Sequence, residues 1–139
     1  FIKKYENEFV KKYDLDNSYV INVDMVGTYI GLLNQRTLFS KNRHKKINQI
    51  LRASAEELDI PVKRFNKMIG PITDHKIFEK FARKTHSDLQ IALIHSDKDS
   101  KYIHSPRDKP EVCSEENLRN CVELCFDVVM KIDALNKEH

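Results

Sequence analysis

The sequence lacks the features that mark a membrane protein or a strong nucleic-acid binder. No apolar run approaches the roughly 20 residues that a helix needs to cross a bilayer. The formal net charge is only +3, which argues against binding that depends on neutralising many phosphates. No signal-peptide pattern, internal repeat or low-complexity segment is present. A hydrophobic fraction of 40% and a charged fraction of 32% then describe a soluble globular protein.

The length of the chain limits the number of domains. A chain of 139 residues is enough for one compact domain with a real core, but not for two. No linker divides it, so we predict one domain over residues 1–139. The chain begins on Phe1 rather than on methionine. We therefore expect that its native start has been removed by processing or truncation, and any localisation signal with it.

Cysteine is scarce as well. Cys113, Cys121 and Cys125 are an odd number and cannot form a complete disulfide framework. Cys121 and Cys125 are four residues apart in a helical pattern, where buried thiols behave as small hydrophobic side chains. We interpret the cysteines as reduced core residues. A zinc site built from them would need a closer pair and further ligands, so none is predicted.

Helical and strand patterns alternate along the chain. Apolar residues at helical spacing predict helices over residues 1–13, 44–60, 75–84 and 114–135. Apolar and β-branched runs predict buried strands over 19–27 and 88–95, and shorter strands near 37–40 and within 61–73. The alternation predicts an α/β fold with a mixed, largely parallel sheet flanked by helices.

The last predicted helix has a long apolar face. Its members are Leu118, Cys121, Val122, Cys125, Val128, Val129 and Ile132. We expect this helix to start at Ser114 and to bury that face, Val122 included, against the sheet. Val122→Asp would then unfold the domain, because it would bury an unpaired charge.

Asp24 stands out inside the apolar run "VINVDMVG". An unpaired buried charge costs several kcal/mol, and a fully buried aspartate usually has a partner. Two interpretations are open at this point. Asp24 is either a strand-end aspartate that caps a neighbouring loop, or a metal ligand at the carboxyl end of a core strand, where open α/β sheets place their sites.

His104 lies in the polar stretch 95–112, a loop without regular period. Pro106 and Pro110 stiffen this loop, because proline fixes its own φ and restricts the residue before it. A loop of this length in a compact domain is usually functional or disordered. A lone loop histidine is most often a surface residue, but paired in space with Asp24 it would supply half of a metal site.

Asp74 and His75, in "TDHKIF", start the third predicted helix. The simple interpretation is that Thr73 or Asp74 caps the helix. The functional one is that Asp74 orders a loop of the active site or orients a substrate amine.

These three segments occur in an order that resembles the C-terminal part of the di-zinc exopeptidase family. "VINVDMVG" is similar to that family's Asn/Gln-Leu-Asp-Met strand end, and "GPITDHKIF" to its Ser-Asp-His-x-x-Phe segment. "YIHSPRDKPEVCSEENL" is similar to its His-Thr/Ser-x-x-Asp-Thr loop before a closing helix. The family includes bacterial leucyl aminopeptidases, glutamate carboxypeptidase and the related glutaminyl cyclases. The resemblance spans about residues 19–132 and implies that residues 1–139 are the C-terminal part of a single zinc-exopeptidase catalytic domain.

The resemblance implies roles for the matching residues. Asp24 would be a ligand of one zinc ion and His104 a ligand of the other. Asp74 and His75 match the family's Asp-His pair, which lies behind the ligands or against the substrate. Asp108 matches the loop aspartate that follows the histidine and would hold the loop in shape.

Three positions depart from the family pattern. Tyr102 is near the place where some members have an oxyanion-stabilising tyrosine, but Ile103 directly precedes the histidine. Thr73 replaces the family's serine, and Lys109 replaces its threonine.

Half of the family's site has no match in the chain. A His-x-Asp pair that bridges the zinc ions and a Glu-Glu pair that supplies the general base both precede the Asp24 strand in family order. No histidine lies upstream of Asp24, and Glu6 and Glu8 are separated by Asn7. No catalytic residue is therefore assigned in this chain, and the general-base glutamate is expected upstream.

The implied function is that of a zinc-dependent exopeptidase, aminopeptidase-like, which hydrolyses terminal peptide bonds. Two zinc ions would activate a water molecule and polarise the scissile carbonyl, and a glutamate would transfer the proton. We expect this chain alone to be inactive. We also expect it to bind no zinc tightly, because two ligands of different metals do not make a four-coordinate site.

Two rival interpretations remain open. One is a glutaminyl cyclase-like transferase, a branch that tends to place a tryptophan before its ligand histidine, whereas this chain has no tryptophan. The other is a non-catalytic binding domain of the same fold. The upstream sequence, read for His-x-Asp and Glu-Glu, would separate the three.

The expected partners are a peptide substrate and the missing N-terminal part of the same domain, with no nucleic acid and no membrane-spanning segment. For the compartment the indications conflict. The family is often secreted or periplasmic, while unpaired cysteines favour the cytoplasm.

Overall fold

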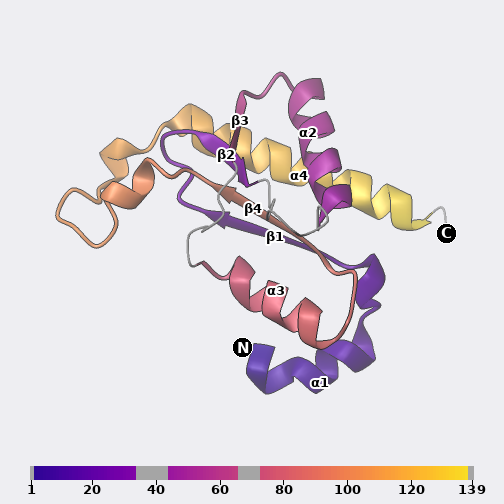
Figure 1. The fold of residues 1–139 in the computed structure, drawn as a ribbon. Coiled ribbons are helices and arrows are strands. Elements are labelled where there is room, and N and C mark those ends of the chain that lie inside the picture. Colours follow the sequence, from indigo (N-terminus) through magenta and orange to yellow (C-terminus); the bar gives the residue numbers. More distant parts are fainter. Residues whose placement is uncertain (1, 34–43, 66–72, 138–139) are drawn as a thin grey trace.

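A computed structural model describes residues 2–33, 44–65 and 73–137 of the chain (Figure 1). Its elements are α1 (Ile2–Lys12), β1 (Tyr19–Asp24), β2 (Ile30–Leu33), α2 (Lys45–Glu57), β3 (Val62–Phe65), α3 (His75–Lys84), β4 (Gln90–His95) and α4 (Glu115–Lys137), with short 3-10 turns η1 (Leu15–Asn17), η2 (Asp99–Lys101) and η3 (Pro110–Val112). The predicted helices and the strand within 61–73 are present. The strand expected near 37–40 lies outside the described residues.

The strands form one mixed sheet in the order β1-β4-β2-β3. β1 runs parallel to β4, from the pair Tyr19 and Gln90 to the pair Asp24 and His95. β2 runs antiparallel to β4 and parallel to β3. The predicted mixed, largely parallel sheet is therefore confirmed. β1 ends at Asp24, three residues before the predicted end, and β2 lies in a segment that the sequence pattern left ambiguous.

Helices cover both faces of the sheet (Figure 1). The larger core lies under α2 and α4, where Leu51, Ile94 and Leu124 are fully buried. The smaller core lies under α3, where Phe81 packs with Ile91. α1 covers α3 from outside, and its Phe9 ring meets the Phe81 ring edge-on at 6.4 Å between centroids.

The buried face of α4 differs from the predicted one. Cys121, Leu124 and Val128 are buried, and Cys125 and Ile132 pack against the same core. Val122, by contrast, is 69% exposed. The apolar residues of α4 form two stripes about a third of a turn apart, and only the stripe that meets α2 and the sheet is covered.

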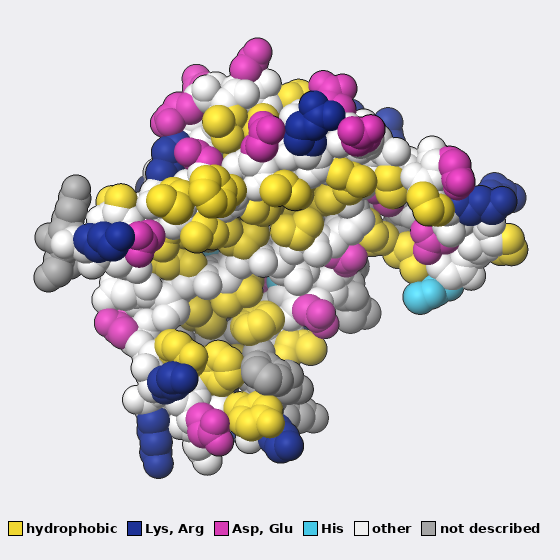
Figure 2. Space-filling model, turned by 180° about the vertical axis from the view of Figure 1, so that it is seen from behind, with side chains coloured by type: hydrophobic (Ala, Val, Ile, Leu, Met, Phe, Trp, Pro, Cys, Tyr) yellow, Lys and Arg dark blue, Asp and Glu magenta, His cyan; other side chains and the backbone are white. Residues whose placement is uncertain are grey.

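The second stripe lies on the surface. It consists of Leu118, Val122, Phe126, Val129 and Met130, all at least 42% exposed. Figure 2 shows it as an elongated hydrophobic band over α4. The expectation that Leu118, Val122 and Val129 face the sheet is wrong. The expected unfolding by Val122→Asp rested on that burial and loses its physical basis.

The start of α4 matches its sequence signal, whereas the start of α3 does not. The Ser114 hydroxyl accepts a hydrogen bond from the Asn117 backbone N–H at 3.2 Å, as expected of a cap. The Asp74 side chain makes no capping hydrogen bond, and its backbone is already helical at φ −57° and ψ −25°.

The cysteines are free thiols, but only one of them is fully buried. Cys121 is buried, Cys125 is half-buried and Cys113 is exposed. The hydrogen bond to Cys125, together with burial, raises the pKa of Cys121, which stays a protonated thiol. No helix of the described ranges is both long and apolar enough to cross a membrane.

The two stripes of α4 predict opposite responses to truncation. Leu124→Ala should lower the free energy of unfolding by about 2–5 kcal/mol, because it opens a cavity in the core. Val122→Ala should change it by less than about 0.5 kcal/mol, because the side chain is already solvated. Urea unfolding of both variants measures the difference. Equal losses would mean that both stripes of α4 are covered in solution.

Candidate metal centre

Asp24 is the last residue of β1, at the carboxyl edge of the sheet, as predicted. Side chains alternate along β1, so Val20, Asn22 and Asp24 face α3, whereas Ile21 faces the α2 and α4 core. Asp24 itself is half-buried. The residue that follows, Met25, has a left-handed backbone at φ 54°, a conformation that a bulky side chain rarely adopts.

His95 is the neighbour of Asp24 across the sheet. The two residues are partners in the parallel register, and the predicted strands of 19–27 and 88–95 do lie side by side. His95 is fully buried, and its Nδ1 donates to the Asp24 backbone carbonyl at 3.1 Å. The strand end that carries Asp24 is therefore tied to the strand end from which the His104 loop departs.

His104 is exposed on the loop between β4 and α4, which extends beyond the carboxyl ends of both parallel strands (Figure 1). Its backbone is left-handed, at φ 56°. Left-handed residues other than glycine cluster at functional sites. Met25 and His104 are two of five such residues in the described ranges, and the other three are His44, Asp59 and His86. This backbone feature alone therefore does not identify the site.

The loop is a succession of tight turns. Backbone N–H groups of Asp99, Tyr102, Ser105 and Asp108 each donate to the carbonyl three residues earlier, at 2.9–3.3 Å. The Ser105 hydroxyl also donates to the Tyr102 carbonyl at 2.7 Å. His104 lies inside this chain of turns, so its place depends on where the first turn is fixed.

The connection between β1 and β2 crosses over the end of β4, because β4 lies between those two strands. Three contacts join the crossing to the residues after β4. Ser96 donates its backbone N–H to the Met25 carbonyl at 2.7 Å, and its hydroxyl bonds the Thr28 hydroxyl at 2.7 Å. The Tyr29 hydroxyl donates to the Asp97 carboxylate.

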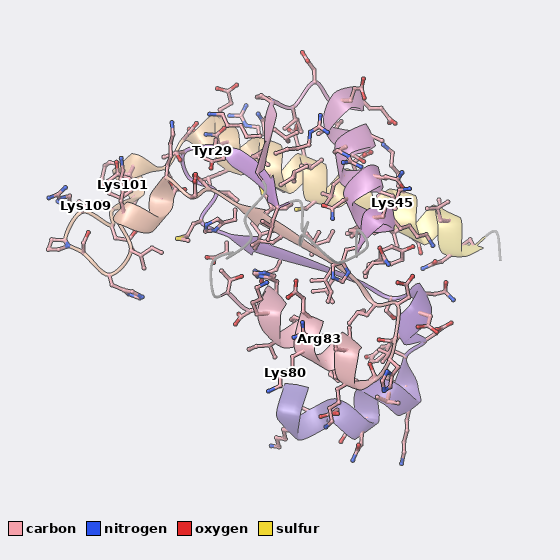
Figure 3. All side chains as sticks on the ribbon, in the orientation of Figure 1. Tyr29, Lys45, Lys80, Arg83, Lys101 and Lys109 are labelled. Atoms are coloured by element: carbon pink, nitrogen blue, oxygen red, sulfur yellow. The ribbon has the colours of Figure 1, made fainter. Side chains whose placement is uncertain are left out.

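Tyr29 stays protonated in this contact. Burial raises the pKa of Tyr29, and the Asp97 carboxylate raises it further. The Asp97 backbone N–H donates to the same hydroxyl at 3.1 Å. Figure 3 shows Tyr29 at the base of the protruding loop, which carries Lys101 and Lys109 farther out.

Gly27 binds both ends of the His104 loop. Its N–H donates to the Asp99 carboxylate at 2.8 Å, and its carbonyl accepts from the Ser114 N–H at 2.8 Å. The Asn117 side-chain amide donates to the same carbonyl at 3.4 Å. A Cβ atom at this position would lie 2.9 Å from the Cys113 sulfur, so a larger residue would have to displace the Cys113 side chain.

Replacing this glycine should loosen the loop. Gly27→Ala should lower the free energy of unfolding by about 1–3 kcal/mol, because Cys113 must move. Cys113→Ala in the Gly27→Ala background should restore part of the loss, since it removes the sulfur that clashes. Urea unfolding of the two single variants and the double variant tests this coupling. Strictly additive effects would contradict the packing described here.

The start of α3 lies against β1. Asn22 donates its side-chain amide to the Thr73 hydroxyl at 3.3 Å, and that hydroxyl bonds Nδ1 of His75. The Thr73 hydroxyl therefore links the amide of Asn22 on β1 to the imidazole of His75 on α3. His75 is fully buried and Asp74 is exposed.

His75 is held neutral by its surroundings. Burial lowers the pKa of His75 below its usual 6.5, and the Glu79 carboxylate one turn away opposes this only in part. Nε2 of His75 and Oε1 of Glu79 are buried and have no hydrogen-bond partner among the described residues. A buried hydrogen-bond donor that has no acceptor lowers the free energy of unfolding by about 1–3 kcal/mol.

The lowered pKa of His75 predicts a loss of stability in acid. Above pH 6.5 the imidazole is neutral in both the folded and the unfolded chain. Below pH 6.5 the unfolded chain takes up the proton first, so stability falls as the pH falls toward the folded pKa. His75→Gln should flatten the dependence of the melting temperature on pH between 7.5 and about 5. His86→Gln, which changes an exposed histidine, should leave the slope as it is. Equal slopes in all three proteins would contradict the prediction.

Tyr102 and Asp108 lie on the His104 loop. Tyr102 is half-buried and has the Lys101 ammonium 4.7 Å from its ring centre. The Asp108 carboxylate is exposed and makes no hydrogen bond in the described ranges. The carboxylate that braces the loop is Asp99 instead. The sequence analysis missed it because "SDKDS" has the composition of a solvated turn.

The described residues do not make a complete metal site. Across 2–33, 44–65 and 73–137, no three histidine, cysteine or carboxylate side chains are grouped to hold an ion. Asp24 and His104 supply ligand types that zinc accepts, from two segments tied together at Gly27. That they face each other stays a prediction.

The sheet and its helices have the fold of a bacterial aminopeptidase. The chain superposes on the aminopeptidase from Aneurinibacillus sp. strain AM-1 with a TM-score of 0.63 at 18% sequence identity, which shows the fold alone. The match covers 94% of this chain and 30% of that one, so the chain spans less than a third of that aminopeptidase. No curated protein matches the chain significantly.

The sequence match identifies the family. Residues 6–129 match peptidase family M28. Because the match extends over most of the chain, this protein belongs to peptidase family M28, a family of metallopeptidases. The resemblance drawn from the three sequence segments is thereby confirmed at the level of the family.

Proposed function

We propose that the chain is the C-terminal part of the catalytic domain of a zinc exopeptidase of the aminopeptidase type. Asp24 serves as ligand of one zinc ion and His104 as ligand of the other. The observation that carries the proposal is the attachment of the His104 loop to Gly27, three residues after Asp24, by hydrogen bonds at both ends of the loop. Two distant segments thereby share one anchor at the carboxyl edge of the sheet.

The chemistry of the two side chains supports this assignment. Carboxylate oxygen and imidazole nitrogen bind zinc at about 2.0–2.2 Å. The half-buried Asp24 and the exposed His104 are both accessible to an ion. Zinc bound by such ligands supplies Lewis acidity and lowers the pKa of a bound water. The general base and the remaining ligands come from outside this chain, which alone is inactive.

The partner that completes the site is the N-terminal part of the same domain. β1 is an outer strand of the sheet, and its Val23 side chain is 45% exposed, whereas every residue of β4 is buried. Parallel strands normally have both faces covered, and an outer strand leaves backbone N–H and C=O groups unpaired along one edge. The free edge of β1 is therefore where further strands would continue the sheet.

The substrate is a peptide with a free terminus at the metal site. Asp74, exposed at the start of α3, is suited to bind a substrate amine. His75 acts behind it, because it is buried and holds Thr73 against β1. Tyr102 lies at the loop and has a hydroxyl that could donate to a carbonyl oxygen.

The ligand roles are tested in the complete protein that contains this chain. Asp24→Ala and His104→Ala should each lower the hydrolysis of aminoacyl substrates by about 100-fold or more and the bound zinc from two ions toward one. His86→Ala is the matched control, since it removes an exposed histidine outside the site. Zinc content by mass spectrometry is measured beside activity. Unchanged zinc content in both variants would overturn the assignment.

Zinc binding by the isolated chain is a second test of the same proposal. Calorimetric titration of residues 1–139 with zinc at neutral pH should show no tight binding. Stoichiometric binding that His104→Ala abolishes would show instead that this chain holds a complete site.

A further inference from the structure

Asp99 is a buried carboxylate for which the proposed chemistry has no use. It lies in η2, five residues before His104, and is only 9% exposed. Its neighbour Lys98 is exposed, as are most charged residues of this loop. A carboxylate is seldom buried unless hydrogen bonds compensate for the lost solvation. Its bonds therefore indicate what it does.

Both bonds of Asp99 go to the backbone that follows β1. Its Oδ2 accepts from the N–H groups of Gly27 at 2.8 Å and Thr28 at 3.2 Å. Hydrogen bonds from backbone N–H groups to a carboxylate are about twice as strong as those between neutral groups. Its Oδ1 is buried without a partner among the described residues. Asp99 is thus fixed through one oxygen, against the crossing that begins at Asp24.

The outer part of the loop has no buried apolar side chain. Its residues from 104 to 113 are half-buried or exposed, so no apolar core fixes their position. The turns that carry His104 begin at Ser96 and pass through Asp99, whose carbonyl accepts from Tyr102 at 2.9 Å, before they continue through Ser105. A shift of Asp99 would therefore be passed along the turns to His104.

We infer that Asp99 is a positioning residue of the metal centre, because its carboxylate fixes the His104 loop against the residues that follow Asp24. This inference rests on the proposed function, since it takes Asp24 and His104 as ligands. Asp99 touches neither metal nor substrate. It acts through the backbone of Gly27 and Thr28 on one side and through the turn to Tyr102 on the other.

Two substitutions at Asp99 distinguish a role in positioning the loop from a general loss of stability. Asp99→Asn keeps a side-chain oxygen that can accept both N–H groups, so the loop stays in place. Asp99→Ala leaves both buried N–H groups without an acceptor, and the loop loses its anchor. Glu111→Gln is the matched control, because it removes an exposed carboxylate from the same loop.

The experiment uses the complete protein, loaded with zinc, well below the melting temperature of each variant. Zinc content, kcat and KM are measured for the three variants. Asp99→Ala should lower kcat by about 10–100-fold with a smaller change in KM, and lower the zinc content from two ions toward one. Asp99→Asn should restore most of both quantities, and Glu111→Gln should match the parent.

The outcomes are distinct. Full zinc content and parental kcat in Asp99→Ala would overturn the inference, and so would a loss that merely follows the unfolded fraction seen by circular dichroism. If Asp24→Ala and His104→Ala lose zinc while Asp99→Ala keeps it, only this inference fails. If those two variants keep their zinc as well, the proposed function itself has failed.

Discussion

The two hydrogen bonds at the peptide groups of Gly27 hold the candidate site together. Its N–H binds the Asp99 carboxylate, and its carbonyl binds the Ser114 N–H. These bonds join the start of the β4–α4 loop, the start of α4 and the crossing between β1 and β2. They add to the contacts of Ser96 and Asp97 at the base of the loop and extend the attachment to both of its ends. The same close approach of Asp99 and Cys113 leaves little room for a Cβ atom at Gly27.

One face of the sheet packs in the larger apolar core, and the other carries the polar groups of the candidate site. Ile21 and Ile94 face α2 and α4, where the larger core consists of apolar side chains. Asn22, Asp24 and His95 face α3, where polar groups lie near the carboxyl edge. Alternation along a strand places these two sets on opposite sides. Polar groups can thus gather at one edge while the other face remains apolar.

Membership of peptidase family M28 agrees with a polar carboxyl edge, although the described residues hold no group of three possible metal ligands. The chain spans 30% of the aminopeptidase that it superposes on, and β1 is an outer strand of the sheet. Nε2 of His75 and Oδ1 of Asp99 are buried without a hydrogen-bond partner among the described residues.

The sequence by itself determined the local features, because helical and strand periodicity, caps and breakers act over a few residues. It predicted α2, α3, β4 and the Ser114 cap, placed Asp24 at a strand end and, through three ordered segments, indicated the family. Tertiary structure alone decided contacts between distant segments. The apolar pattern of α4 fits two stripes equally well, and only packing on α2 selects Leu124 over Val122. Asp99 resembles its solvated neighbours in sequence, and it becomes the anchor of the loop only because β2 lies beyond β4 and brings Gly27, 72 residues away in the chain, beside it.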